Sequence, residues 1–145
     1  MSSDDFLDSK LMKPIDDVII IDDEQSVIDV LEMYCENLGC FRNIITATDG
    51  AMGAKKLANQ KFSLILLDVN MPKRKGGDII KEMALGTSDN VIESICVVSG
   101  NIDKAFLTEA LELGVKHYMV KPFTEEQFQE KAKKVLKTIN PSLFK

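Results

Sequence analysis

The sequence predicts an α/β protein with one doubly wound parallel sheet of five strands and five helices. Short apolar runs alternate along the chain with segments whose apolar residues recur at helical spacing, so each strand is followed by a helix. Two of the apolar runs stop abruptly at aspartates, as expected where a strand buried on both faces ends in a polar loop. Right-handed crossovers between neighbouring parallel strands then place helices on both faces of the sheet.

The first half of the chain contains three predicted strands, each a run of four mostly apolar residues. They are residues 18–21, 44–47 and 64–67. A helix is expected from about Ser26, because apolar residues recur after it at three- and four-residue spacing, and Gly39 gives its C-terminal stop. A short, alanine-rich helix is expected at residues 50–60. This half therefore has the order strand, helix, strand, helix, strand.

The second half continues the same alternation. Gly76 and Gly77 predict a break before a helix at about 78–84. The remaining elements are expected as a strand at 95–98, a helix at 104–113, a strand at 118–120 and a helix from about residue 125 to 139. In the last helix the apolar residues follow an i, i+4, i+7, i+8, i+11 pattern, which is typical of a helix packed on a sheet.

Composition and charge indicate one compact domain and exclude several classes of function. We expect an acidic tail at residues 1–14, a single domain at 15–140 and a short C-terminal tail at 141–145. With a net charge of −5 the chain lacks the dense basic surface of a nucleic-acid-binding protein. Residues 1–10 lack a basic start and no apolar run approaches the roughly 20 residues of a membrane span, so we expect no membrane insertion and a cytoplasmic location.

Polar side chains follow four of the predicted strands at their carboxyl ends. They are Asp22 and Asp23, Asp68, Ser99 and Lys121. Ligands of doubly wound folds bind outside this edge of the sheet, near the point where the strand order reverses. Three carboxylates that meet there repel one another unless a cation neutralises them, and Mg²⁺ prefers such oxygen ligands. The sequence therefore predicts a magnesium site suited to phosphate chemistry.

Asp68 is the predicted nucleophile of that chemistry, because a carboxylate can attack phosphorus to form an acyl phosphate. Mg²⁺ and Lys121 would stabilise charge on the transferring oxygens, and Ser99 could bond the new phosphoryl group. Taken singly, an aspartate at a strand end is usually a turn or helix-capping residue, and a lysine is usually a solvated charge. Their joint position at the ends of the first, third and fifth strands favours a site.

The same residues stand in motifs that resemble receiver domains of two-component response regulators, which have a flavodoxin-like fold. The motifs are I-I-I-D22-D23-E, L-L-D68-V-N-M-P72, V-V-S99-G and Y118-M-V-K121-P122-F. Their order and spacing match the family from about residue 15 to 140, and stand-alone, CheY-like chemotaxis regulators look most similar. The resemblance implies a signalling switch and not an enzyme: its only reactions would be autocatalytic phosphotransfer to its own aspartate and autodephosphorylation.

The resemblance also implies a role for each residue of the site. Asp68 corresponds to the phospho-acceptor, Asp22 and Asp23 to the pair that holds Mg²⁺, and the backbone carbonyl of Asn70 to a further metal ligand. Ser99 and Tyr118 correspond to the switch hydroxyl and the switch aromatic. Lys121 corresponds to the family's lysine, followed by a cis peptide bond to Pro122. Asn70 and Asn101 occupy positions that influence how water reaches the acyl phosphate, so we expect them to set its lifetime.

In the family, phosphate arrives from a sensor histidine kinase, a phosphotransfer protein or a small phosphodonor. It remodels the face of the fourth helix, fifth strand and fifth helix, here residues 104–113, 118–120 and 125–139, which an effector protein reads. We expect a monomer or a weak, phosphorylation-dependent dimer. Lys73, Arg74 and Lys75 depart from the family pattern, and they form either a solvated loop or a basic patch that steers an anionic donor.

Two other functions stay open at the level of sequence. The first is an Asp-nucleophile phosphohydrolase, although such enzymes need a second acid two residues after the nucleophile, where this chain has Asn70. The second is a pseudo-receiver adaptor that docks to partners without taking phosphate, although every expected site residue is present. The sequence has one histidine, His117, so it predicts neither a histidine-containing catalytic triad nor a histidine-rich metal site.

Overall fold

The computed structural model describes residues 16–71, 75–86 and 88–141. The predicted acidic tail of residues 1–14, the side chains of Lys73 and Arg74, and residues 142–145 of the predicted C-terminal tail lie outside the described residues. Within the described part, none of the helices has both the length and the apolar character needed to cross a membrane.

Five parallel strands form a single sheet, as predicted. They are β1 (Val18–Ile21), β2 (Ile44–Ala47), β3 (Leu64–Leu67), β4 (Ile95–Ser99) and β5 (His117–Val120). The strand order is β2-β1-β3-β4-β5, so the winding direction reverses between β1 and β3. Neighbouring β1 and β3 are in level register, from Val18 opposite Leu64 to Ile21 opposite Leu67. The residues that follow these two strands therefore leave the sheet side by side.

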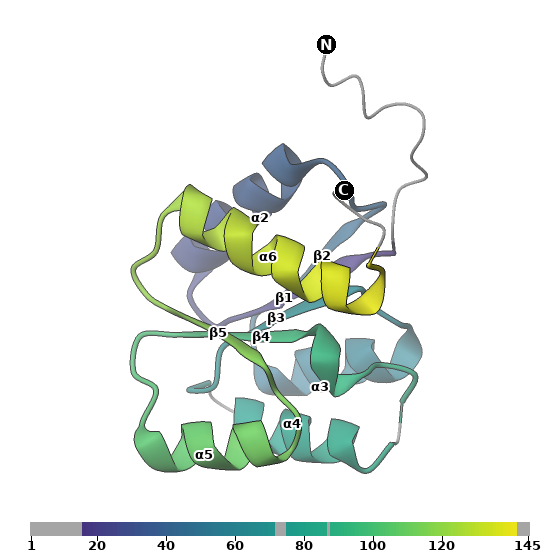
Figure 1. The fold of residues 1–145 in the computed structure, drawn as a ribbon, viewed down its shortest axis with the longest axis vertical. Helices are drawn as coiled ribbons and strands as arrows, with labels where there is room; N and C mark the ends of the chain where they lie inside the picture. Colours follow the sequence, from purple (N-terminus) through teal and green to yellow (C-terminus); the bar gives the residue numbers. More distant parts are fainter. Residues whose placement is uncertain (1–15, 72–74, 87, 142–145) are drawn as a thin grey trace.

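Helices cover both faces of this sheet, which confirms the doubly wound architecture (Figure 1). On one face lie α2 (Gln25–Leu38) and α6 (Glu125–Ile139), and on the other lie α3 (Gly50–Asn59), α4 (Gly76–Ala84) and α5 (Lys104–Glu112). A short 3₁₀ helix, η1 (Ile92–Ser94), precedes β4 and was not predicted. A single 3₁₀ turn spans too few residues to leave a periodic pattern in the sequence.

The strands β1 and β3 are apolar along their whole length because each contributes to two cores. Ile19 and Ile21 of β1 belong to the core under α3, α4 and α5, whereas Val18 and Ile20 belong to the core under α2 and α6. Alternate side chains of a strand point to opposite faces, so burying both faces requires an unbroken apolar run. The two cores fix the sheet between the helix layers and hold its carboxyl edge in place.

The helix α4 begins two residues earlier than the sequence pattern predicts. Gly76 and Gly77 were interpreted as a break, yet both lie in the first turn of α4. A Cβ atom at Gly76 would lie 2.6 Å from the carbonyl oxygen of Asp68 and 2.7 Å from Cα of Val69. Gly76 is therefore required for close approach of α4 to the loop after β3, and not for interrupting the helix.

We predict that Gly76→Ala destabilises the protein by about 1–3 kcal/mol, because the added methyl group meets backbone atoms that cannot rotate away. Gly77→Ala is the matched control, since a Cβ there meets only the ring of Phe106 at an ordinary 3.6 Å. Urea unfolding of both variants measures the difference. Equal stability of the two variants would contradict the packing role assigned to Gly76.

Candidate functional site

The candidate site lies where the winding of the sheet reverses. Because β1 and β3 end level with each other, Asp22 and Asp68 emerge from adjacent strands. The backbone N–H of Asp68 donates to the carbonyl oxygen of Ile21 at 2.9 Å, which extends the ladder up to the site. The main-chain hydrogen bonds of the sheet therefore position these two carboxylates.

Three carboxylates converge at this edge. One oxygen each from Asp22, Asp23 and Asp68 lies within 4.8 Å of the others. Asp22 and Asp68 are buried and Asp23 is exposed. Burial strengthens the repulsion between the first two, since little water separates their charges. The cluster is therefore strongly anionic and open to solvent on the side of Asp23.

Lys121 is the cation that the fold brings into this cluster. Its Nζ lies 2.9 Å from Oδ2 of Asp22 and 3.9 Å from Oδ2 of Asp68. Its backbone N–H donates to the carbonyl oxygen of Ser99 at 3.0 Å, which ties the end of β5 to the end of β4. The peptide bond between Lys121 and Pro122 is cis.

Glu24 is the residue at the site that the sequence reasoning missed. Lys121 Nζ donates a 3.0 Å hydrogen bond to Oε1 of Glu24, across a sequence separation of 97 residues. Glu24 directly follows the two predicted metal ligands Asp22 and Asp23, and this proximity was the available signal. Its contact with Lys121, just after β5, depends on the reach of a long side chain, which local sequence does not encode.

The acid–base properties of the site follow from burial and from these contacts. Burial, followed by the charge of Asp22, raises the pKa of Asp68 to about 6. Burial also raises the pKa of Asp22, although Lys121 acts in the opposite direction. Burial lowers the pKa of Lys121, but the neighbouring carboxylates of Asp22 and Glu24 outweigh it and leave the pKa above its ordinary value. Lys121 is thus protonated, and it compensates the cluster only in part.

The residues present fit a divalent metal ion. All three converging groups are carboxylates, the oxygen ligands that Mg²⁺ prefers. Oδ2 of Asp22 is buried and lies 2.9 Å from the ammonium of Lys121, which leaves a lone pair of this oxygen for a further ligand such as a metal ion. The N–H of Asn70 donates to Oδ1 of Asp68 at 3.3 Å, which places the backbone of Asn70 next to that carboxylate.

Ser99 lies at the end of β4, and Asn70 and Asn101 lie in the loops after β3 and β4. Ser99 ends β4 and is buried, and its Oγ accepts a 3.4 Å hydrogen bond from the N–H of Asn101. The side-chain amide of Asn70 donates to the carbonyl oxygen of Asn101 at 3.3 Å, so a hydrogen bond joins the loops after β3 and β4. The two asparagines that sequence reasoning grouped together are therefore in contact.

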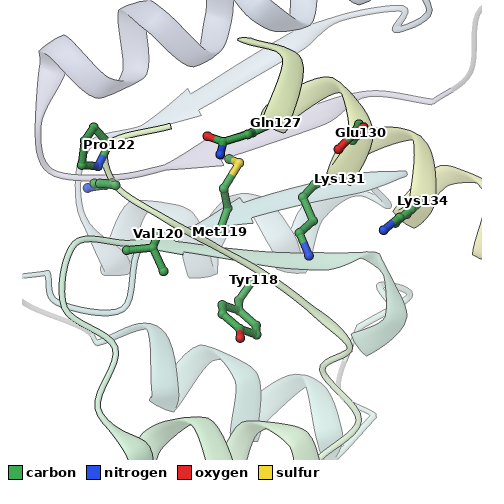
Figure 2. Close-up of a pocket in the computed structure, with 9 residues that line it drawn as sticks. Tyr118, Met119, Val120, Pro122, Gln127, Glu130, Lys131 and Lys134 are labelled. Atoms are coloured by element: carbon green, nitrogen blue, oxygen red, sulfur yellow. The ribbon is translucent and has the colours of Figure 1, made fainter. Parts of the chain in front are cut away.

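Tyr118 lies on the opposite side of β5 from the buried Met119 and is 39% exposed. Figure 2 shows its ring beside Lys131 of α6, whose Nζ lies 5.6 Å from the ring centroid, a cation–π distance. A groove of about 500 Å³ between β5 and α6 runs past Tyr118 and Lys131 to Pro122. Tyr118 thus lies exposed at this groove, in contact with Lys131.

Comparison with known proteins identifies the family of the chain. The family model described as response regulator receiver domain matches residues 18–133, which is most of the chain. The chain belongs to this family. Its receiver domain is 30% identical over 120 residues to PhoP, the alkaline phosphatase synthesis transcriptional regulatory protein of Bacillus subtilis, with 83% of this chain and 48% of PhoP covered. The chain therefore spans about half the length of that relative.

The receiver domain is also similar to proteins and domains that it covers over nearly their full length. It is 30% identical over 124 residues to the chemotaxis protein CheY1 of Helicobacter pylori, with 83% of this chain and 97% of CheY1 covered. The structure of CheY4 from Vibrio cholerae superposes with a TM-score of 0.73 at 24% identity, covering 84% of this chain and 99% of CheY4. The receiver domain of the histidine kinase PA1611 from Pseudomonas aeruginosa was solved with magnesium in its active site cleft. It superposes with a TM-score of 0.71 at 20% sequence identity, covering 86% of this chain and 98% of the PA1611 domain. These structures establish the CheY-like fold.

Binding of Mg²⁺ to this receiver should weaken as the pH falls through about 6, where a proton begins to compete for Asp68. The raised pKa of Asp22 makes the dependence steeper. We expect an apparent affinity up to about tenfold lower for each pH unit below that value, per proton displaced. Calorimetric titration at pH 5 and pH 7.5 measures this change, and an affinity that is the same at both pH values would contradict it.

Proposed function

We propose that this receiver domain is a phospho-acceptor switch in which Asp68 takes a phosphoryl group with the help of Mg²⁺. The observation that carries the proposal is the buried carboxylate of Asp68, set within 4.8 Å of the oxygens of Asp22 and Asp23 and 3.9 Å from Nζ of Lys121. Asp22 and Asp23 would hold the metal together with Asp68 and the backbone carbonyl of Asn70. When bound, Mg²⁺ would supply charge neutralisation for phosphoryl oxygens.

In the proposed reaction, a carboxylate oxygen of Asp68 forms a bond to the phosphorus of the donor. The bond between phosphorus and the leaving atom of the donor breaks, and its electron pair leaves with that atom. With acetyl phosphate the products are the acyl phosphate of Asp68 and acetate, so no proton has to move. Lys121 faces the developing charge from the side of β5, and Ser99 supplies a hydroxyl that can donate to a phosphoryl oxygen.

The proposed output face consists of α5, β5 and α6, which are the fourth predicted helix, the fifth strand and the fifth helix. Tyr118 and Val120 expose apolar area there, next to the groove along α6 (Figure 2). We propose that a phosphoryl group on Asp68 draws Ser99 toward it, and that Tyr118 turns inward and leaves Lys131. A sensor histidine kinase or phosphotransfer protein would supply the phosphate, and an effector protein would bind this face.

Several further expectations belong to the same proposal. We propose that the domain extends over residues 15–140, slightly beyond the family match at 18–133. We also propose a cytoplasmic protein that is a monomer or a weak dimer after phosphorylation, with no nucleic-acid partner. The steering role proposed for Lys73, Arg74 and Lys75 falls largely on residues outside the described part of the chain.

The experiment that tests the proposal is incubation with acetyl phosphate and Mg²⁺ followed by intact-mass measurement. A switch shows a lasting gain of one phosphoryl group on wild type and no gain on Asp68→Asn. A phosphohydrolase would instead turn over phosphate monoesters continuously, which the amide of Asn70 disfavours because it cannot act as a general acid. A pseudo-receiver adaptor would gain no mass, and that result would reject the proposed function.

The contact between Asn70 and Asn101 leads to a prediction about the lifetime of the acyl phosphate. Asn70→Ala removes the side chain that bridges the loops after β3 and β4, so water should reach the phosphorus more easily. We expect the half-life of the phosphorylated protein to fall several-fold, which is the factor that corresponds to losing one hydrogen bond of about 1 kcal/mol. Decay measured by intact mass after removal of the donor tests this, and a half-life equal to that of wild type would reject the tuning role.

A further inference from the structure

Glu24 occupies the N-cap position of α2 but does not cap the helix. Its backbone is extended, with φ −99° and ψ 111°, and its side chain makes no cap hydrogen bond. Serine, threonine, aspartate or asparagine would normally accept a bond from the first turn at this position. The side chain of Glu24 instead accepts a 3.0 Å hydrogen bond from Nζ of Lys121, the residue that follows β5.

The backbones on both sides of this contact are held in place. The N–H of Glu24 donates to Oδ1 of Asp22 at 2.9 Å, and the N–H of Lys121 donates to the carbonyl oxygen of Ser99 at 3.0 Å. Any adjustment between Glu24 and Lys121 must therefore come from their side chains. The Lys121 side chain is 16% exposed and that of Glu24 is 59% exposed, so the contact lies at the solvent boundary of the site.

The ammonium of Lys121 lies closer to Asp22 and Glu24 than to the acceptor. Its Nζ is at 2.9 Å and 3.0 Å from their carboxylate oxygens, and at 3.9 Å from Asp68, beyond hydrogen-bond distance. Phosphorylation replaces the single negative charge of the Asp68 carboxylate with a phosphoryl group, which carries close to two negative charges and strong acceptor oxygens. Bonding to it would draw the ammonium toward Asp68 and away from Glu24.

We propose that Glu24 is a positioning residue that holds Lys121 in its unphosphorylated arrangement and thereby opposes phosphoryl uptake at Asp68. This inference rests on the proposed function of Asp68. It adds that Glu24 competes with the phosphoryl group on Asp68 for the ammonium of Lys121. Asp22 cannot play the same part once it binds a divalent cation, because its charge is then directed to the metal. Glu24, which is not among the proposed metal ligands, keeps its full charge for Lys121.

The test compares Glu24→Gln, Glu24→Asp and wild type. Glu24→Gln removes the charge at equal length, whereas Glu24→Asp keeps the charge on a side chain that is one methylene shorter and fails to reach Lys121. Glu36→Gln is the matched control, since it makes the same charge change at an exposed position of α2. The measured quantities are the affinity for beryllofluoride at saturating Mg²⁺, followed by NMR, and the rate of phosphoryl uptake from acetyl phosphate.

We expect both Glu24 variants to bind beryllofluoride about two- to fivefold more tightly than wild type and to take up phosphate faster by a similar factor, as for one exposed ion pair. The gain of Glu24→Gln should shrink at high salt, because salt screens the pair in wild type. Glu36→Gln should match wild type. The proposal is overturned if Glu24→Gln shows no gain in affinity or rate. It is also overturned if Glu24→Asp behaves as wild type, because the charge of residue 24, and not its contact with Lys121, would then be what opposes phosphoryl uptake.

Failure of this inference is distinguishable from failure of the proposed function. If wild type binds beryllofluoride and takes up phosphate but the Glu24 variants show no gain, only the role of Glu24 is rejected. If wild type does neither, the phospho-acceptor role of Asp68 is rejected, and the role of Glu24 that depends on it is rejected with it.

Discussion

Asp68→Asn should take up no phosphoryl group from acetyl phosphate, and it should be more stable than wild type when Mg²⁺ is absent. The amide has the shape of the carboxylate but is not a nucleophile toward phosphorus, so the loss of uptake is complete. The gain in stability follows from burial and from the charge of Asp22, which together raise the pKa of Asp68 to about 6. An ionised Asp68 therefore destabilises the folded protein at neutral pH.

The sign of this effect can be checked by changing the pH. A carboxyl whose folded pKa is raised destabilises the protein fully above that pKa, near 6, and not at all well below its ordinary value of 3.8. We expect Asp68→Asn to raise the free energy of unfolding by about 1–3 kcal/mol at pH 7, and to lose that advantage as the pH falls toward 4.

Urea unfolding at pH 7 and pH 4, without added metal, measures the stability of Asp68→Asn, and intact mass measures its phosphoryl uptake. Asp29→Asn is the matched control, because Asp29 is an exposed residue of α2 away from the cluster. A mass gain in Asp68→Asn equal to that of wild type would show that another residue is the phospho-acceptor. A variant that is less stable than wild type at pH 7 would contradict the assigned repulsion.

Lys121→Met is expected to have the second largest effect. It removes the cation that lies 2.9 Å from Asp22 and 3.9 Å from Asp68, while the methionine keeps much of the apolar stem. Loss of one group that stabilises charge in a transition state typically lowers a rate by about 10² to 10³. Lys121 also lowers the pKa of Asp68, so its removal should raise that pKa further above 6 and leave less of the nucleophilic carboxylate.

The rate of phosphoryl uptake as a function of pH tests this account of Lys121. We expect the rate of Lys121→Met to be lower at every pH and its half-maximal pH to be shifted upward. Lys137→Met, at an exposed position near the end of α6, is the control for loss of a positive charge. A slower rate with an unchanged pH midpoint would show that Lys121 acts on the transferring phosphate without perturbing Asp68.

The layout of the site could be predicted from sequence because topology alone brings its residues together. Parallel strands place their carboxyl ends at one edge, so Asp22 and Asp68 had to approach each other once the strands were assigned. The strands themselves were easily recognised, since β1 and β3 are buried on both faces and thus apolar throughout. The family match and the solved structures confirm this fold.

The features that escaped prediction depend on tertiary contacts. Gly76 was interpreted as a helix break, but its role is to let α4 approach the carbonyl oxygen of Asp68. Glu24 joins the site through a side chain that accepts a hydrogen bond from Lys121, which is 97 residues away in the sequence. The outward position of Tyr118 is tied to its contact with Lys131, which belongs to another element. Such contacts leave no periodic pattern in the sequence, and a motif that contains one of these residues does not name its partner.

A crystal structure of the protein with magnesium and beryllofluoride tests the central assignment most directly. We predict beryllium bonded to a carboxylate oxygen of Asp68, magnesium held by Asp22, Asp23 and Asp68, and the ammonium of Lys121 moved from Glu24 to a fluorine atom. A site that stays empty under these conditions, or a side chain of Asp68 that points away from Asp22, would contradict the account.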